Sequence, residues 1–179
     1  LLCNMAALLA GKTVVNLNYT ASEDALAAAL QKAAITQVYT ARRFTRVLEK
    51  KGVAVESVFS DVHMLYLEDI RVGIGKHDLV IAAFASLFPA SLVYRWYGKP
   101  VAIDDPAAIL FSSGSEGSPK GVVLSHRNIV ANCLQVSDVL NTRDDDVIMG
   151  SLPLFHSFGL TVTGFMPLLE GIAVVCHPD

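Results

Sequence analysis

Residues 112–121 read Ser112-Ser113-Gly114-Ser115-Glu116-Gly117-Ser118-Pro119-Lys120-Gly121, a run of small residues that ends in Lys-Gly. Apolar runs at residues 107–111 and 122–124 flank it and favour strands on both sides. Glycine lets the backbone turn its N–H groups inward at little steric cost, serine hydroxyls can donate to oxyanions, and Lys120 supplies a compensating positive charge. Pro119 restricts where that ammonium group can point. The stretch therefore predicts a loop that binds the phosphates of a nucleoside triphosphate.

The alternative for this stretch is a flexible surface loop, the usual structure of segments rich in Ser, Gly and Pro. Two other nucleotide motifs do not fit. A Walker loop places Lys directly after Gly and Ser or Thr directly after Lys, whereas Lys120 follows Pro119 and precedes Gly121. A dinucleotide fingerprint is excluded because no Gly-x-Gly-x-x-Gly pattern opens a helix at this loop.

The composition of the chain describes a globular protein with a large apolar core. Of the 179 residues, 53% are hydrophobic, slightly more than the roughly 45–50% of typical soluble domains. The chain begins at Leu1 inside an apolar run and ends at Asp179 just after a strand-like segment, so we expect it to be part of a larger domain. Its net charge of −3 and the absence of a basic face argue against nucleic acid as a partner.

Three cysteines, Cys3, Cys133 and Cys176, lie in apolar contexts. Their odd number predicts buried, reduced thiols in a cytoplasmic protein rather than a disulfide framework. The spacing of His and Cys residues predicts no metal site within the chain.

Strands and helices are expected to alternate along the chain. Strands are predicted over residues 13–17, 37–39, 107–111, 122–124, 147–150 and 172–176, with one or two more within 53–68; helices are predicted over residues 1–10, from Ser22 onward, and over 41–51, 127–140 and 160–169. This order predicts an α/β fold with a mainly parallel sheet flanked by helices.

Residues 79–94 are uncharged over sixteen consecutive positions. A bilayer span needs about 20 apolar residues, and Pro89 interrupts this run. We therefore expect, in order of preference, a buried helix, contact with a membrane surface, or an interface with other parts of the protein.

A second informative segment is Ser151-Leu152-Pro153-Leu154-Phe155-His156-Ser157-Phe158-Gly159. A single histidine between two phenylalanines is often a hydrogen-bonded core residue. The alternative is a functional imidazole, and the two interpretations stay open at the level of the residues alone.

Both segments resemble motifs of one family. Residues 112–121 are similar, position for position, to the signature loop of the adenylate-forming (AMP-binding) superfamily of acyl-CoA synthetases, peptide-synthetase adenylation domains and luciferases, and Pro153-x-x-His156-x-x-Gly159 resembles its second motif. Within the superfamily, residues 111–126 and 152–162 are most similar to the bifunctional 2-acylglycerophosphoethanolamine acyltransferase/acyl-acyl-carrier-protein synthetase.

The resemblance implies a two-step reaction. A fatty acid attacks the α-phosphorus of ATP to give acyl-AMP and pyrophosphate, and a phosphopantetheine thiol then takes the acyl group. The thiol would belong to an acyl carrier protein or to coenzyme A. In the bifunctional enzyme, the acyl group would then be transferred to a lysophospholipid. The implied location is cytoplasmic, or the cytoplasmic face of the inner membrane with possible membrane contact for the full-length protein.

The resemblance also assigns roles to residues. The implied ATP-binding residues are Ser112, Ser113, Gly114, Ser115, Glu116, Gly117, Ser118 and Lys120. His156 would be the catalytic residue that positions the acyl carboxylate near the α-phosphate. The family more commonly has Thr where this chain has Glu116, whose carboxylate would repel phosphates unless Mg²⁺ lies between them or it points away.

The resemblance implies that residues 1–179 are a fragment of the large N-terminal domain, with a leading α/β part at 1–106 and a part that carries both motifs at 107–179. The family's Tyr-Gly-x-Thr-Glu segment, whose Glu holds Mg²⁺, its Thr-Gly-Asp segment and its C-terminal domain are not found in this sequence. We therefore expect the isolated chain to be inactive. The alternatives are a non-catalytic nucleotide- or lipid-binding module and an acyl-CoA ligase.

Overall fold

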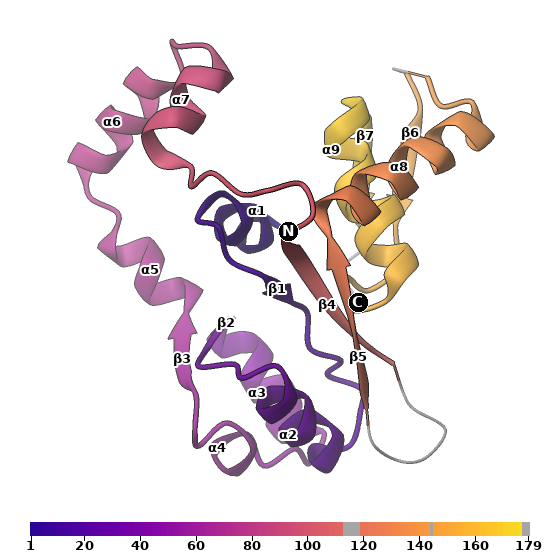
Figure 1. Cartoon of the computed structure of the whole chain (residues 1–179). Helices are drawn as coiled ribbons and strands as arrows, with labels where there is room; N and C mark the ends of the chain where they lie inside the picture. Colours follow the sequence, from indigo (N-terminus) through magenta and orange to yellow (C-terminus); the bar gives the residue numbers. More distant parts are fainter. Residues whose placement is uncertain (113–118, 144, 177–179) are drawn as a thin grey trace. The chain divides into compact units, whose positions relative to one another are not determined.

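A computed structural model describes residues 1–112, 119–143 and 145–176. The helices are α1 (Leu2–Leu9), α2 (Glu23–Lys32), α3 (Arg42–Lys50), α4 (Val55–Val58), α5 (Leu67–Gly73), α6 (Lys76–Ala85), α7 (Ala90–Tyr97), α8 (His126–Leu140), the π-helix η1 (Gly159–Phe165) and α9 (Met166–Glu170). The strands are β1 (Val14–Val15), β2 (Gln37–Thr40), β3 (His63–Tyr66), β4 (Pro106–Ser112), β5 (Lys120–Ser125), β6 (Val147–Gly150) and β7 (Ala173–Cys176). The expected α/β fold is confirmed (Figure 1).

The strands form three small sheets, ordered β1-β4-β5, β2-β3 and β6-β7. β1 pairs with β4, β2 with β3, and β6 with β7, all in parallel. Each parallel pair is joined by a connection that contains helices, as parallel pairing requires. The link from β4 to β5 is too short for such a crossover, so these two neighbouring strands form a hairpin.

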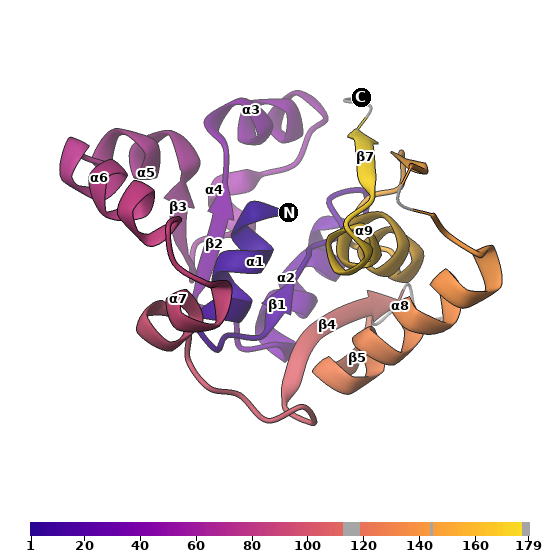
Figure 2. The same cartoon turned by 90° about the horizontal axis from the view of Figure 1, so that it is seen from above.

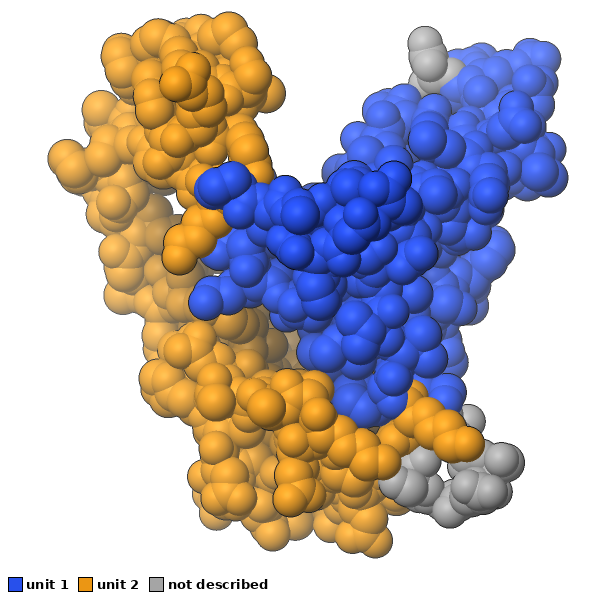
Figure 3. Space-filling view, in the orientation of Figure 1, with its two compact units in different colours: residues 1–17, 100–112, 121–179 blue, residues 18–99, 113–120 orange. Residues whose placement is uncertain are grey.

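The chain divides into two compact units, which Figure 3 colours separately. Unit 1 comprises residues 1–17, 100–112 and 121–179, and unit 2 comprises residues 18–99 and 113–120. In unit 2, helix α4 packs against α2 and α3. The core of unit 2 includes Leu26, Leu30, Leu48, Val55 and Phe59.

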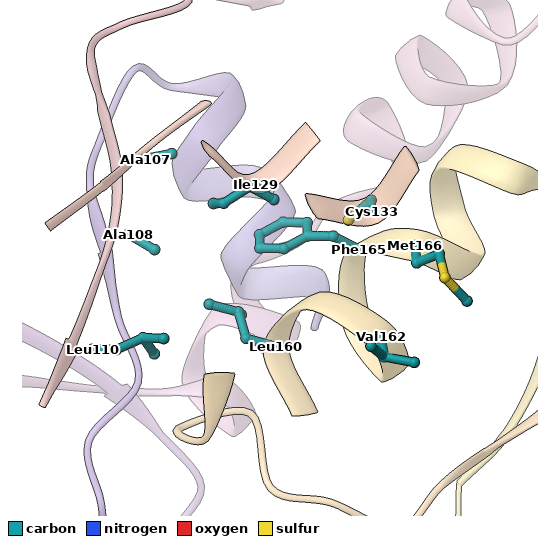
Figure 4. Close-up of a cluster of buried hydrophobic side chains, with 9 residues drawn as sticks. All are labelled: Ala107, Ala108, Leu110, Ile129, Cys133, Leu160, Val162, Phe165 and Met166. Carbon is teal, nitrogen blue, oxygen red and sulfur yellow. The ribbon is translucent and has the colours of Figure 1, made fainter. Parts of the chain in front are cut away.

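Unit 1 is built around β4. Both Ala107 and Ala108 are buried, so side chains on opposite faces of this strand are covered. Helix α8 contacts β4, η1 and α9 (Figure 2). The core cluster consists of Ala107, Ala108, Leu110, Ile129, Cys133, Leu160, Val162, Phe165 and Met166. Figure 4 shows the ring of Phe165 in the middle of this cluster.

Two helices begin at a serine cap. Ser22 Oγ accepts a hydrogen bond from Ala25 N at 3.3 Å at the start of α2. Ser125 Oγ accepts from Asn128 N at 3.2 Å, and Asn128 Oδ1 accepts from Ser125 N at 3.0 Å, at the start of α8. These bonds satisfy N–H groups that have no partner inside the helix.

Residues 53–68 contain one strand, β3, as expected, and also the short helix α4, whose Val55 is buried where α4 packs against α2 and α3. The expectation of three buried thiols needs correction. Cys133 is buried, but Cys3 is half-buried and Cys176, at the end of β7, is exposed. An apolar sequence context therefore did not decide the exposure of an individual thiol.

The expected buried helix over residues 79–94 is also wrong. The segment breaks around Pro89 into α6 and α7, and Ala85 is the one buried residue of these two helices. Leu79 and Leu87 are 60% and 78% exposed. Phe88, between the two helices, makes edge-to-face ring contacts with Phe84 of α6 and with Trp96 of α7. The apolar side chains surround α6 rather than forming one stripe, and Leu79, Val80 and Phe84 are largely exposed. No helix in the described ranges is long and apolar enough to cross a bilayer.

Candidate functional site

Strand β4 leads into the predicted phosphate-binding loop from a fixed position. Its register with β1 pairs Ala108 with Val14, and Thr13 Oγ1 donates a hydrogen bond to Pro106 O at 3.1 Å. Ser112 is the last residue of β4 and is exposed. Six of the predicted site residues, Ser113, Gly114, Ser115, Glu116, Gly117 and Ser118, lie outside the described residues.

The described chain resumes at Pro119, which is buried, and Lys120, which begins β5 and is exposed. A side chain at Gly121 would meet the ring of Phe111 at 3.1 Å and Ile109 Cγ2 at 3.3 Å. Glycine therefore lets β5 lie close to side chains of β4. The predicted strands on both sides of the loop are confirmed, and their ends present one hydroxyl and one ammonium group.

Helix α2 supplies a contact that the sequence did not reveal. Lys32 Nζ donates a hydrogen bond of 2.9 Å to Pro119 O across 87 residues of sequence. A lysine at the end of a helix is ordinary, because it suits the negative end of the helix dipole. Nothing in the sequence therefore pointed to a partner in the loop.

The turn before β4 is tied to the helix after β5. Arg127 binds Asp104 through two hydrogen bonds, Nε to Oδ1 at 2.6 Å and Nη2 to Oδ2 at 3.0 Å. The bonds from Arg127 hold the pKa of the Asp104 carboxyl below its ordinary value. The N–H groups of His126 and Arg127 also donate to Asp105 O and Ile103 O, at 3.2 and 2.8 Å. The start of β4 and the end of β5 are thus held by one network.

His156 lies in a turn between β6 and η1. Its N–H donates to Pro153 O at 3.1 Å, and its carbonyl accepts from Leu160 N at 2.8 Å. The residue is exposed, and its ring packs against Phe155 with 4.5 Å between centroids. The interpretation of His156 as a buried core histidine is therefore wrong, and its imidazole is accessible to a ligand.

Gly159 and η1 hold the turn of His156 in place. A Cβ atom at Gly159 would lie 2.1 Å from Pro153 O and 2.9 Å from Leu152 O, so the backbones approach more closely than a side chain permits. All seven residues of η1 are buried. Thr161 Oγ1 and Thr163 Oγ1 donate to the carbonyls of Ser157 and Gly159, both at 2.6 Å. Glycine at position 159 is therefore a steric requirement of the segment.

Unit 1 also contains an apolar cavity of about 160 Å³. It is lined by Met5, Leu8, Ala107, His126, Ile129, Val130, Phe165, Leu168 and Leu169. Pockets that enclose drug-sized ligands measure about 300–1,000 Å³. The cavity is therefore too small to enclose a ligand of that size.

The predicted site residues fall in both units. Ser112 and His156 belong to unit 1, and Lys120 belongs to unit 2. Each residue is held locally by a strand end or a turn of the described chain. Their assignment to an ATP site is an interpretation of the sequence motifs.

A family profile described as AMP-binding enzyme matches residues 1–179. Among curated proteins, the chain is 43% identical to a sulfoacetate–CoA ligase of Cupriavidus necator over 108 residues, which are 59% of this chain and 21% of that protein. It is 28% identical to the acyl-CoA ligase AKT1 of Alternaria alternata over 176 residues, which are 94% of this chain and 30% of that protein.

A third relative is the medium-chain-fatty-acid–[acyl-carrier-protein] ligase JamA of Moorena producens. It is 31% identical over 84 residues, which are 47% of this chain and 14% of that protein. The chain thus spans less than a third of the length of each of these relatives.

Solved structures show the same fold. ATP-bound MatB from Rhodopseudomonas palustris superposes with a TM-score of 0.67 at 23% identity, over 98% of this chain and 32% of that chain. The O-succinylbenzoate coenzyme A synthetase MenE of Bacillus subtilis, in complex with ATP and magnesium ion, gives a TM-score of 0.68 at 18% identity, over 97% of this chain and 32% of that chain. At these identities the likeness concerns the fold.

Proposed function

This chain belongs to the AMP-binding enzyme family, and from that premise we propose that its protein is an acid–thiol ligase that activates a carboxylic acid with ATP. The observation that carries the proposal is the family match over all 179 residues. The signature stretch 112–121 starts at the last residue of β4 and ends at the second residue of β5. The reaction would form acyl-AMP and pyrophosphate and then a thioester. Activation is needed because a carboxylate oxygen is a poor leaving group.

The described ends of the loop suit a triphosphate. Ser112 carries an exposed hydroxyl and Lys120 an exposed ammonium group, and both can donate hydrogen bonds to phosphate oxygens. In the proposed site, Lys120 offsets the negative charge that grows on the departing pyrophosphate. Mg²⁺, when bound, would neutralise part of the phosphate charge. We propose that its protein ligand lies outside residues 1–179.

His156 is proposed to position the acid. Its imidazole is exposed while its backbone is fixed by hydrogen bonds on both sides, to Pro153 O and from Leu160 N. A rigid backbone with an exposed side chain suits a group that must meet the carboxylate in one geometry. The proposed role is to hold the acyl carboxylate near the α-phosphate.

We further propose that residues 1–179 are a part of the large N-terminal domain of a longer protein and are inactive alone. Each of the relatives described above is more than three times as long as the segment it shares with this chain. Acid-dependent exchange of pyrophosphate into ATP by the isolated chain would contradict this part of the proposal.

A fatty acid is the proposed substrate, and an acyl carrier protein is the proposed thiol acceptor. The resemblance of residues 111–126 and 152–162 supports this choice, as does the similarity to JamA. The similarity to two ligases that are named for CoA favours coenzyme A as the second candidate. Thioester formation by the full-length protein with each acceptor separates the two.

The most specific part of the proposal is that the protein re-acylates a lysophospholipid. It is supported by the same two segments, and it would require an acyltransferase domain outside this chain. The proposed location is cytoplasmic, or the cytoplasmic face of the inner membrane for the full-length protein. Transfer of labelled acyl groups to lysophosphatidylethanolamine by the full-length protein tests this step.

The test of the ATP site uses the full-length protein with Lys120→Ala and Ser115→Ala combined. We expect acid-dependent ATP–pyrophosphate exchange to fall at least about tenfold, because charge stabilisation of the transition state is lost. Lys99→Ala, at another exposed lysine, is the matched control. Equal exchange in both proteins would refute the assignment of the loop. Binding of ATP without any acid-dependent exchange would instead favour a non-catalytic module.

A further inference from the structure

One hydrogen bond links the end of helix α2 to the residue that precedes Lys120. Lys32 is the last residue of α2, and its Nζ donates to Pro119 O at 2.9 Å. Pro119 is buried, although the residues that follow it in β5 are exposed up to Val123. The backbone just before the predicted phosphate-binding lysine is therefore held by a cationic donor.

The helix that carries Lys32 is firmly placed. Ser22 caps its N-terminus, and Leu26, Ala29 and Leu30 bury its inner face. The chain after α2 is also fixed, because Ala34 N and Ile35 N donate to the carbonyls of Gln31 and Leu30 at 3.0 and 2.9 Å. A side chain at such a helix end extends from a rigid support.

The bond to Pro119 is more than a general attraction to the helix dipole. A lysine that merely suits the dipole would lie near the last carbonyls of its own helix, whereas Nζ of Lys32 bonds a carbonyl 87 positions later in the chain. Proline has a fixed φ and no N–H group, so its carbonyl is the one backbone group through which Pro119 can be hydrogen-bonded. Moving that carbonyl moves the adjoining Lys120.

We propose that Lys32 is a positioning residue for the ATP site, holding Pro119 and thereby setting where Lys120 presents its ammonium group. The inference rests on the proposed function, because it assumes that Lys120 meets phosphate. Lys32 itself touches no reacting atom in this role. Its effect is on the apparent affinity for ATP, while the site for the acid is left as it was.

The experiment uses the full-length protein and Lys32→Met, which keeps the length of the side chain and removes the donor. We expect KM for ATP to rise by about three- to tenfold with kcat little changed, since a charged hydrogen bond that fixes the loop end is lost. KM for the carboxylic acid is expected to stay the same. Lys32→Arg, which keeps a cationic donor, is expected to restore most of the affinity.

Lys50→Met, at the last residue of α3, is the matched control for the loss of a helix-terminal lysine. Equal KM values for ATP in Lys32→Met and Lys50→Met would overturn the inference. So would a lower unfolding midpoint of Lys32→Met with unchanged KM for ATP, because Lys32 would then act in stability alone. Absence of exchange in the wild-type protein would refute the proposed function itself, and this inference with it.

Discussion

At the scale of single residues, the site depends on a few positions where the surroundings leave little choice. Gly159 is the clearest, because a Cβ atom there would lie 2.1 Å from Pro153 O. Gly121 is more tolerant, since its nearest neighbours are side-chain atoms of Phe111 and Ile109 at 3.1 and 3.3 Å. The two glycines therefore differ in what substitution would do.

We expect Gly159→Ala to lower the free energy of unfolding by about 1–3 kcal/mol, because the backbone at Leu152 and Pro153 must move to admit a methyl group. In the full-length protein the same change should reduce ATP–pyrophosphate exchange, since the turn of His156 moves with Pro153. Gly73→Ala is the control, because the space around Gly73 is open. Unfolding in denaturant measures the stability, and equal values for the two variants would contradict this account.

The ion pair of Asp104 and Arg127 is expected to make the stability of the protein depend on pH. The pKa of Asp104 is lowered by hydrogen bonds from Arg127, so its stabilising effect is present above the ordinary carboxyl pKa of about 3.9 and disappears as pH falls through the lowered value. Arg127→Gln should return the pKa of Asp104 toward its ordinary value. Carboxyl titration by NMR measures this, with Arg46→Gln as the control; the same pKa in both variants would argue against the pair in solution.

At the scale of elements, helix α8 connects the loop strands to the core. Its first turn is held by the reciprocal bonds of Ser125 and Asn128, and its inner face buries Ile129 and Cys133. Burial raises the pKa of the Cys133 thiol, so this group stays protonated and packs as a small apolar residue. The helix thus joins a capped end beside β5 to the centre of unit 1.

We expect Ser125→Ala to cost about 1 kcal/mol of stability, because the N–H of Asn128 loses its acceptor. Ser125→Asp should retain most of the stability, since a carboxylate also accepts this bond and suits the start of a helix dipole. Thermal unfolding compares both variants with Ser60→Ala, an exposed serine outside the helices. A Ser125→Ala protein as stable as the Ser60→Ala control would show that the cap contributes nothing.

At the scale of the whole molecule, helices α6 and α7 expose several large apolar side chains. Leu79, Val80 and Phe84 are 60%, 67% and 59% exposed on α6, Leu87 between the helices is 78% exposed, and Trp96 on α7 is 50% exposed. Large exposed apolar patches mark interaction surfaces or promote association. The isolated chain is therefore expected to associate through this surface.

Val80→Glu combined with Leu87→Glu should shift the isolated chain toward monomer with little loss of stability, because neither side chain is buried. Sedimentation at increasing concentration measures the change. Val139→Glu with Leu140→Glu, at exposed positions of α8, is the control for added charge. Equal association of the two double variants would exclude α6 and α7 as the surface responsible.

The sequence by itself determined the strands on either side of residues 112–121 and the α/β class, because these follow from the periodicity of apolar residues and the alternation of strands and helices. Only the tertiary structure decided that His156 is exposed, that residues 79–94 form two largely exposed helices, and that Lys32 binds Pro119. Those facts depend on which distant residues pack together. A local sequence pattern indicates whether a segment tends to form a helix or a strand. It does not indicate which distant residues bury that segment or form hydrogen bonds with it.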